Sequence, residues 1–213
     1  MSYAVKEVFY TLQGEGAQAG RAAVFCRFAG CNLWSGLERD RATARCRFCD
    51  TDFRGTDGAG GGYFVDAERL AAHIAACWPR DADPQAIPYV VCTGGEPALQ
   101  LDAALIAALH AHGFEVGVES NGTLALPAGI DWVCISPKAG TELMVRRGDE
   151  LKLVYPQPGA EPERYVGLAF EHRILQPLDD AERAAHTEAA AAHCLADPRW
   201  RLGIQMHKLV GLP

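Results

Sequence analysis

The segment YVVCTGGEP, from Tyr89 to Pro97, places an apolar run directly before a polar, glycine-rich turn. The same arrangement recurs where short β-branched runs lead into ESNG at 119–122, SPK at 136–138 and QPLD at 176–179. Short apolar runs bounded by turn residues are typical of buried strands. The carboxyl ends of parallel strands meet at one edge of a sheet, where α/β proteins bind ligands. The pattern predicts a parallel sheet with a ligand site at that edge, which a fifth strand end, TLQGE at 11–15, should join.

The rest of the chain alternates between strand and helix patterns. Helices are predicted from about Asp66 to Pro79, over Leu101–Leu109, and from a capping box at Asp179 and Glu182 through about Leu195. The alternation favours crossover helices on a parallel sheet, and 213 residues are too few for a complete eight-fold barrel of the usual size. We expect one α/β domain, residues 1–213, built as a partial, modified (β/α) barrel. The predicted strands are Val5–Tyr10, Ala22–Phe28, Tyr89–Cys92, Phe114–Glu119, Trp132–Ser136, Leu151–Tyr155, Arg173–Gln176 and Arg201–Gln205.

The composition is that of an ordinary globular protein, with 49% hydrophobic and 22% charged residues. A net charge of -7 argues against a broad nucleic-acid interface. Neither a basic, apolar leader nor an apolar run of membrane-spanning length is evident, so we expect a cytoplasmic protein with no membrane contact. Disulfides are rare in that compartment, and the eight cysteines are therefore expected to be thiols or metal ligands.

Three cysteines form a pattern of their own: Cys31, and the pair Cys46 and Cys49 in CRFCDT. A Cys-x-x-Cys pair and one further cysteine supply three of the four iron ligands of a 4Fe-4S cluster, which leaves one iron open to a small molecule. The competing interpretation is a structural zinc site, but zinc usually needs a fourth protein ligand, and none is evident. The other cysteines lie in apolar patterns and are expected to be small buried side chains: Cys26, Cys77, Cys92, Cys134 and Cys194.

Taken in order, the motifs LQGEG (12–16), CRFCDT (46–51), TGGEP (93–97), ESNG, SPK and QPLD resemble those of the radical S-adenosylmethionine (SAM) enzymes, and among these the 7-carboxy-7-deazaguanine synthase family. The resemblance covers nearly the whole chain and implies a barrel of the radical SAM type. It also implies a lyase of queuosine (7-deazapurine) biosynthesis, a tRNA modification pathway. The implied reaction converts 6-carboxy-5,6,7,8-tetrahydropterin to 7-carboxy-7-deazaguanine with loss of ammonia, using a 4Fe-4S cluster, S-adenosylmethionine and Mg²⁺.

The first two cysteines depart from the usual radical SAM spacing, because fourteen residues, Asn32–Arg45, separate Cys31 from Cys46. A cluster fixes distances in space and not along the chain, so a longer loop satisfies it at an entropic cost. We expect this insert to be a looped-out excursion that returns the chain to the cysteine pair.

The resemblance also implies roles for individual residues. Thr51 would bind Mg²⁺, and Cys31, Cys46 and Cys49 the cluster. The cofactor would contact Phe48, Cys49, Gly94, Gly95, Glu96, Ser136, Pro137, Lys138, Gln176, Pro177, Leu178 and Asp179. The substrate would contact Leu12, Gln13, Gly14, Glu15, Arg27, Thr93 and the carboxylate of Pro213. No catalytic acid or base is identified, although Glu15 and Glu119 are candidates for assisting ammonia loss.

Two other functions fit parts of the pattern. A zinc-binding module that is not an enzyme would explain the cysteines but not the polar strand ends. A glycyl-radical activating enzyme would share the cluster and cofactor motifs, but it would need a surface for a partner protein. For the synthase we expect a pterin substrate, a reducing protein such as flavodoxin or ferredoxin, and a homodimer that covers open sheet edges.

Overall fold

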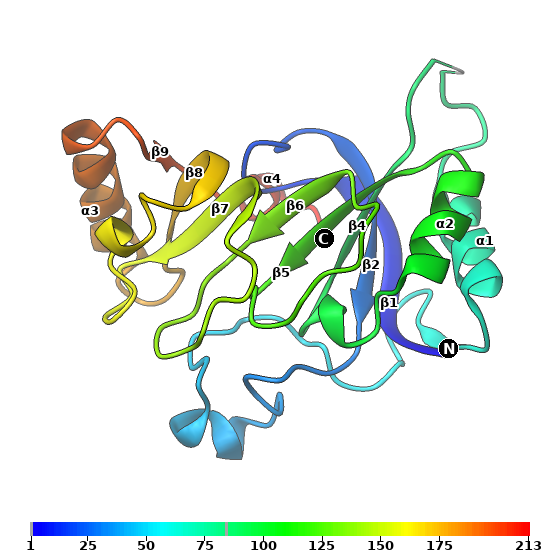
Figure 1. Ribbon diagram of the computed structural model, residues 1–213, viewed down its shortest axis with the longest axis horizontal. Coiled ribbons are helices and arrows are strands. Elements are labelled where there is room, and N and C mark those ends of the chain that lie inside the picture. The colour runs from blue at the N-terminus through cyan, green and yellow to red at the C-terminus, as the bar shows by residue number, and fades with distance from the viewer. Residues whose placement is uncertain (1, 84) are drawn as a thin grey trace.

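The computed structural model describes residues 2–83 and 85–213, which form a nine-stranded sheet in the order β3-β1-β2-β4-β5-β6-β7-β8-β9 (Figure 1). From β2 to β9 all neighbouring strands are parallel, whereas β1 pairs antiparallel with both β2 and β3. The strands are β1 (Tyr3–Leu12), β2 (Ala22–Phe28), β3 (Gly62–Phe64), β4 (Tyr89–Gly94), β5 (Glu115–Ser120), β6 (Trp132–Ile135), β7 (Arg147–Tyr155), β8 (Ala169–Pro177) and β9 (Arg201–Leu202).

Helices cover one face of the sheet. Figure 1 shows α1 (Ala67–Cys77) and α2 (Ala103–Ala111) together on one flank and α3 (Arg183–Ala196) at the opposite end. Asp66 and Asp102 cap the first two helices, because each carboxylate accepts a hydrogen bond from the backbone N–H three residues on. The remaining elements are a short helix α4 (Met206–Val210) and three 3₁₀ turns at Glu38–Thr43, Pro97–Leu99 and Pro162–Arg164. No helix in residues 2–83 and 85–213 is long and apolar enough to cross a membrane.

Side chains along the strands alternate between a face of the sheet that packs against helices and a face that does not. Val24, Val90 and Val116 are fully buried in a core cluster that also contains Leu70 of α1 and Leu105 of α2. Successive residues of a strand point to opposite faces, so the neighbours of these valines face away from the helices. That second face lines a cavity. One face of the sheet therefore packs into the hydrophobic core, and the other face carries the groups that line the cavity.

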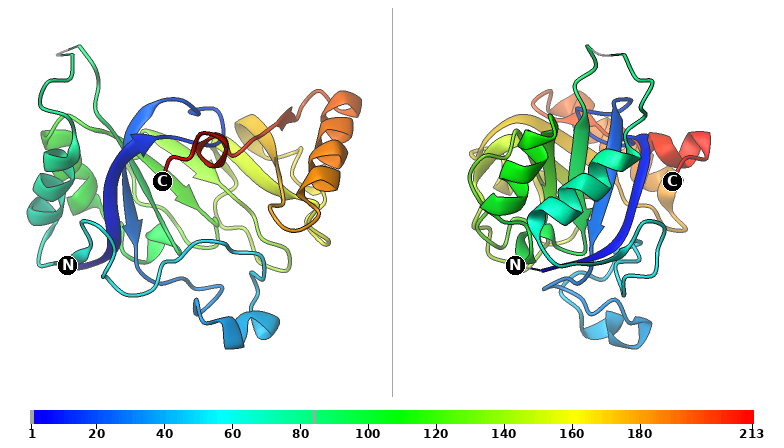
Figure 2. Two further views of the ribbon diagram at one scale, coloured as in Figure 1. Left: turned by 180° about the vertical axis from the view of Figure 1, so that it is seen from behind. Right: turned by 90° about the vertical axis from the view of Figure 1, so that its right-hand side faces the viewer.

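The sheet does not close into a barrel, since β3 and β9 form its two edges. The chain after β9 crosses back toward β1, as the view from behind shows (Figure 2, left). There the backbone N–H of Met206 donates to the carbonyl of Gly14, at 2.8 Å. Residues 203–213, which we call the C-terminal strap, therefore link the β9 side of the sheet to the β1–β2 connection.

The prediction of an α/β partial barrel is confirmed, and seven of the predicted strands and all three helices lie close to their expected positions. Three details were wrong. The eighth predicted strand, Arg201–Gln205, ends at Leu202. The helix α3 has Glu182 at its N-cap with no side-chain capping bond, so no capping box forms. Of the five additional cysteines, Cys77 and Cys194 are only partly buried.

The prediction that the fifth strand end, Thr11–Glu15, lies at the same edge of the sheet as the other four was also wrong. Because β1 runs antiparallel to β2, Leu12 pairs with Ala22 at the start of β2, at the far edge from Gly94. Residues 12–15 nevertheless line the cavity, since they reach it along the open face of the sheet.

Candidate active site

A cavity of about 510 Å³ lies on the open face of the sheet and extends to the carboxyl ends of the parallel strands. Its wall contains every residue predicted to bind the cluster, Mg²⁺, cofactor or substrate, with the exception of Glu96 and Pro137. Polar side chains from several strands line it, among them Arg27 (β2), Thr93 (β4), Glu119 (β5), Lys152 (β7) and Gln176 (β8).

The three cysteines line this cavity and influence one another electrostatically. Burial raises the pKa of the Cys31 and Cys46 thiols, and the charge of Lys138 acts in the opposite direction at Cys46. The Lys138 ammonium donates to the carbonyl and hydroxyl oxygens of Ser136, at 2.7 Å each, and lies 5.8 Å from the centre of the Phe48 ring. A partly buried cation beside the cysteines favours the thiolate form.

A 4Fe-4S cluster and a single zinc ion require different cysteine arrangements. In residues 2–83 and 85–213, no group of three or more His, Cys, Asp or Glu side chains converges so as to hold one metal ion. The sulfur ligands of one zinc ion all lie about 2.3 Å from the same point. The cysteines of a cubane bind three different irons and are therefore farther apart. Cys31, Cys46 and Cys49 line one cavity wall.

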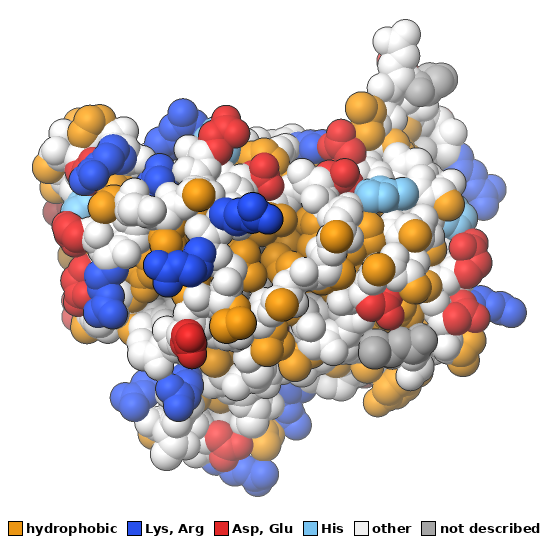
Figure 3. Space-filling view, in the orientation of Figure 1, with side chains coloured by type: hydrophobic (Ala, Val, Ile, Leu, Met, Phe, Trp, Pro, Cys, Tyr) orange, Lys and Arg blue, Asp and Glu red, His pale blue; other side chains and the backbone are white. Residues whose placement is uncertain are grey.

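The insert folds back onto the cysteine pair. Its chain closes where the N–H groups of Arg45 and Cys46 both donate to the carbonyl of Leu33, at 3.1 and 3.4 Å. The Arg41 side chain donates to the carbonyls of Arg47 and Cys49, at 2.9 and 3.0 Å, and its guanidinium lies over the Trp34 ring. Figure 3 shows Lys and Arg side chains at the lower end of the molecule, where Figure 1 places the insert. Arg41 thus connects the insert to the Cys46–Cys49 backbone.

Gly94 and Gly95 allow close backbone approach at the base of the cysteine loop. Gly94 has φ +155°, and a Cβ on it would lie 2.9 Å from the Phe28 nitrogen. A Cβ on Gly95 would overlap the Gly30 carbonyl oxygen and lie 2.8 Å from the Cβ of Cys31. The N–H of Glu96 then donates to that same Gly30 carbonyl, at 2.9 Å. These glycines hold the end of β4 against the chain that carries the first cysteine.

Glu96 lies behind the cavity wall and is fully buried. Its carboxylate accepts hydrogen bonds from the Ser120 hydroxyl and the N–H groups of Asn121 and Ala98, at 2.7, 2.8 and 2.9 Å. Burial raises its pKa, and these three donors counteract that rise. In this position Glu96 orients Ser120 and Asn121, which do line the cavity.

A buried lysine and two carboxylates form a polar group in the cavity wall. The ammonium of Lys152 lies 2.8 Å from Glu15 Oε2 and 3.2 Å from Glu119 Oε1. Gln13 donates to Glu119 Oε1 at 2.9 Å, and Gln205 donates to Glu15 Oε1 at 2.8 Å. Burial alone would raise the pKa of Glu15, but Lys152 and the Gln205 bond outweigh it and lower the pKa to about 2. Glu15 is therefore a stable anion.

A third carboxylate, Glu150, is 2% exposed and lies beside this group. It accepts a hydrogen bond from the N–H of Ala17 at 2.8 Å, and a Cβ on Gly16 would overlap it. Burial raises the pKa of Glu150, and Lys152 lowers it in part. Glu150 therefore fixes the backbone that follows Glu15.

One buried polar atom in the cavity wall, Gln176 Oε1, lacks a hydrogen-bond partner in the part of the chain that the structure describes. Lys152 Nζ lies 2.8 Å from Glu15 and 3.2 Å from Glu119, so these contacts take up two of its three N–H groups. A buried polar atom without a partner costs free energy, so a ligand that satisfies it gains affinity. The wall thus offers a free acceptor.

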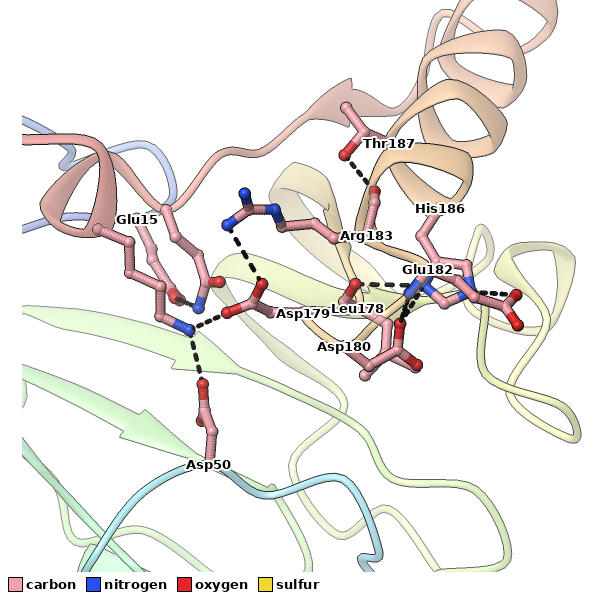
Figure 4. Close-up of polar contacts among 11 residues, drawn as sticks. Glu15, Asp50, Leu178, Asp179, Asp180, Glu182, Arg183, His186 and Thr187 are labelled. Carbon is pink, nitrogen blue, oxygen red and sulfur yellow. Dashed lines mark hydrogen bonds and ion pairs between the residues drawn. The ribbon is translucent and has the colours of Figure 1, made fainter.

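The C-terminal strap completes the cavity. Figure 4 shows Asp50, next to the cysteine pair, and Asp179, at the end of β8, on two sides of one ammonium group. This ammonium belongs to Lys208, which lies 2.8 Å from Asp50 and 2.6 Å from Asp179. His207 packs on Gly14, where a Cβ would overlap its ring. The strap therefore connects the cluster loop, β8 and the residues after β1.

The other predicted residues have these neighbours. Arg27 Nε donates to Glu7 at 2.7 Å, and Thr51 lies in the cavity wall between Asp50 and Asp52. The Thr11 hydroxyl lies 3.4 Å from the carbonyl oxygen of Pro213, which brings that residue to the cavity.

Sequence reasoning missed Lys152, Glu150, Gln205, His207 and Lys208. A signal for the first two was present, since charged residues alternate with leucines in ELKLVY, 150–155, within a strand whose other face is buried. No pattern in the sequence pointed to the strap residues.

Comparison with known proteins agrees with this geometry. The model of the Radical SAM superfamily matches residues 40–154. A fold, a cysteine set and a family match of this kind define the class, and the chain is a radical SAM enzyme. It binds a small-molecule substrate and draws electrons from a reductant, and the superfamily implies a 4Fe-4S cluster and S-adenosylmethionine as cofactors.

Full-length relatives define the family within that class. The chain is 63% identical to the 7-carboxy-7-deazaguanine synthase of Bordetella pertussis and 56% identical to that of Burkholderia multivorans, each over 100% of both chains. It also resembles the crystal structure of QueE from Escherichia coli, with a TM-score of 0.68, 27% identity, and coverage of 97% of this chain and 95% of that one. The chain belongs to the 7-carboxy-7-deazaguanine synthase family.

Proposed function

We propose that this enzyme converts 6-carboxy-5,6,7,8-tetrahydropterin to 7-carboxy-7-deazaguanine and ammonia, a carbon–nitrogen lyase reaction in queuosine biosynthesis. The main observation is that the three cysteines and the Glu15–Lys152–Glu119 group line one and the same cavity. A cavity of this size suits a cofactor and a small heterocycle together. The relatives that cover the whole chain carry the name of this synthase.

The cofactors would be held by the predicted residues. Cys31, Cys46 and Cys49 would bind the cluster, which together with S-adenosylmethionine supplies a hydrogen-abstracting radical when bound. The unpartnered Gln176 Oε1 would accept a hydrogen bond from a hydroxyl or amino group of the cofactor's adenosine. Phe48, Ser136 and Lys138 would line the same side. The protein's contribution is to position both molecules and to exclude water.

We infer that Thr51 supplies a hydroxyl ligand to Mg²⁺, a cation that prefers oxygen ligands and keeps several from water or substrate. Its place in the cavity wall beside the cysteine pair supports this role. Thr51→Ala should retain its iron and lose most of the stimulation of turnover by added Mg²⁺. An unchanged magnesium requirement in this variant would count against the assignment.

The substrate would occupy the side of the cavity that Leu12, Gln13, Gly14, Glu15, Thr93 and Pro213 line. Arg27 would bind its carboxylate through the guanidinium nitrogens that the Glu7 contact leaves free, because that contact uses Nε alone. Of the two candidates, Glu119 would accept or return a proton during ammonia loss, whereas Glu15, with a pKa of about 2, is too weak a base for that step. The strap closes this side, which favours a small molecule over the backbone of a partner protein.

A reducing protein such as flavodoxin or ferredoxin would supply electrons to the cluster. We also propose a homodimer, since the β3 edge of the sheet presents Tyr63, 78% exposed, next to the exposed Val65. Covering an open, apolar edge removes an aggregation hazard.

The test is direct turnover. Anaerobically reconstituted, reduced protein with S-adenosylmethionine, Mg²⁺ and the tetrahydropterin should yield 7-carboxy-7-deazaguanine and ammonia in equal amounts, measured by chromatography with mass detection. Cys46→Ala should yield neither. Cofactor cleavage without any deazaguanine would retain the radical enzyme and reject the substrate.

A further inference from the structure

Lys138 differs from the other lysines of the chain in its charged neighbours. Each of the other three lies within 3.2 Å of two carboxylates: Lys6 beside Asp52 and Asp57, Lys152 beside Glu15 and Glu119, and Lys208 beside Asp50 and Asp179. Within residues 2–83 and 85–213 no carboxylate forms an ion pair with Lys138, whose ammonium donates to the carbonyl and hydroxyl oxygens of Ser136 instead. Lys138 thus brings a positive charge with no paired carboxylate in the described part of the chain into the cavity wall.

The charged groups that act most strongly on Lys138 are two of the cysteines. Burial lowers the pKa of the ammonium, and Cys46 and Cys49 oppose this effect more strongly than Glu96 does. In return, the charge of Lys138 partly offsets the rise in the pKa of Cys46 that burial causes. The ammonium also lies 5.8 Å from the centre of the ring of Phe48, which stands between the two cysteines in the chain. The cation therefore lies beside the cysteine pair.

The position of this ammonium is fixed by the segment that follows β6. Gln157, which is buried, accepts a hydrogen bond from the N–H of Ala139 at 2.8 Å and donates to the carbonyl of Pro137 at 3.3 Å. The Thr141 hydroxyl donates to the carbonyl of Lys138 at 2.7 Å. A charge that its surroundings hold in place stabilises a neighbouring charge without first being reoriented.

Reduction changes the charge of a 4Fe-4S cluster. One electron enters the cluster and no bond forms or breaks, so the net charge of the cluster and its three thiolates becomes more negative by one. A nearby cation stabilises the reduced form more than the oxidised form. Local charge and hydrogen bonds set the reduction potential of a cluster. At a partly buried site, one charge several ångströms from another changes an equilibrium about tenfold or more.

We propose that Lys138 is a counter-charge for the cluster and makes it easier to reduce, in addition to its contacts with the cofactor. This rests on the proposed function, which assigns the cluster to Cys31, Cys46 and Cys49. A cluster that is easier to reduce accepts its electron from a reductant of less negative potential. Lys138 therefore widens the range of reducing proteins that can serve this enzyme.

The test measures the reduction potential of the cluster without S-adenosylmethionine, so that contacts of Lys138 with the cofactor do not contribute. Anaerobically reconstituted protein is titrated with dithionite in the presence of redox mediators, and the reduced cluster is measured by electron paramagnetic resonance. At a given potential, the ratio of reduced to oxidised cluster should be at least about tenfold lower in Lys138→Met than in the wild type, which is a midpoint about 59 mV more negative. Equal midpoints in the two proteins would overturn the proposal.

Two matched variants separate the charge of Lys138 from other effects. Lys138→Arg keeps a positive charge in the cavity wall, and its ratio should stay within about threefold of the wild-type ratio. Arg47→Met removes a positive charge from the CRFC segment itself, but Arg47 is exposed and does not line the cavity, so the ratio should change by less than about twofold. An equal shift in Arg47→Met and Lys138→Met would reject the proposal, as would a full shift in Lys138→Arg.

Iron content decides the case in which a variant does not assemble a cluster. Iron lost from Lys138→Met and retained by Lys138→Arg would show that the cluster needs the charge, which supports the proposal. Iron lost from both variants would show that the Ser136 contacts act on the fold, which rejects it.

The wild-type titration tests the cluster assignment separately. Wild-type protein without a four-iron signal would overturn the proposed cluster, and the role of Lys138 with it. A normal wild-type titration with an unshifted Lys138→Met would leave the proposed function intact and reject the counter-charge alone.

Discussion

At the scale of single residues, Gly95 controls how closely β4 approaches the cysteine loop. A Cβ there would overlap the Gly30 carbonyl and press on Cys31. Gly95→Ala should lower the free energy of unfolding by about 1–3 kcal/mol, because backbone on both sides must shift. It should also lower the iron content after reconstitution, measured by iron assay and thermal unfolding.

Gly167→Ala is the matched control, because a Cβ on Gly167 would have no neighbouring atom within 4 Å and the residue has no positive φ. Its iron content and unfolding temperature should equal those of the wild type. Normal iron retention in Gly95→Ala would show that the cysteine loop tolerates the displacement.

Glu15 gives a prediction about pH. The folded pKa of Glu15 is about 2, below its ordinary value of 4.5, because Lys152 and Gln205 outweigh the effect of burial. A lowered folded pKa contributes stability that is complete above the unfolded pKa and is lost as pH falls through the folded pKa. We therefore expect the wild-type apoprotein to have a higher free energy of unfolding than Glu15→Gln, by an amount that stays constant between about pH 5 and 8. Below about pH 4.5 this difference should become smaller. Urea unfolding across this range measures the difference, and a difference that changes near neutral pH would contradict the prediction.

The residues that sequence reasoning found and missed differ in a physical way. Motifs identify residues whose backbone is constrained, such as Gly94, or whose chemistry is distinctive, such as Cys46. Lys152 belongs to no motif, and only its alternation with leucines marks it as the cavity-facing position of a strand. Long-range contacts such as Gln205 with Glu15, separated by 190 positions, leave no local signal.

At the scale of elements, the insert should matter for cluster retention more than for folding. Arg41 holds the carbonyls of Arg47 and Cys49, and the insert contributes no residue to the large core clusters. Arg41→Ala should therefore lose iron faster in the presence of a chelator, with an unfolding temperature of the apoprotein close to that of the wild type.

Arg39→Ala is the control for this prediction. Arg39 lies in the same 3₁₀ turn, is highly exposed, and has only a 3.8 Å contact with Asp40. Surface ion pairs of this kind contribute little. Equal rates of iron loss in the two variants would show that Arg41 does not support the cysteine pair.

The spacing of hydrophobic residues predicted the long elements, because buried residues recur at regular intervals along them, as in α1 and β2. It failed for elements with few buried residues. The strand β3 has three residues, none fully buried, and α4 has five, also without a buried residue. The antiparallel direction of β1 was missed because direction depends on the connection Gln13–Arg21, which turns the chain back directly into β2.

At the scale of the whole molecule, the strap links parts of the chain that are far apart in sequence. Lys208 joins Asp50 to Asp179, and removing it should loosen the strap without affecting the buried cores. Lys208→Met should raise the KM for the pterin severalfold while kcat changes less, because the strap helps to form the cavity but bears no reacting group. Steady-state kinetics and far-UV circular dichroism would test this. A fall in kcat alone, with an unchanged KM, would place Lys208 in the chemistry instead.

The two faces of the sheet have different freedom to change during evolution. The helix-facing side chains of β2, β4 and β5 are packed against α1 and α2, so most substitutions there reduce stability. The cavity-facing side chains alternate with the core-facing ones along the strands. They are Arg27, Thr93 and Glu119 on β2, β4 and β5, and Lys152 and Gln176 on β7 and β8. A lineage can therefore replace these five positions and acquire a new substrate while it inherits the same core, radical chemistry and cluster loop.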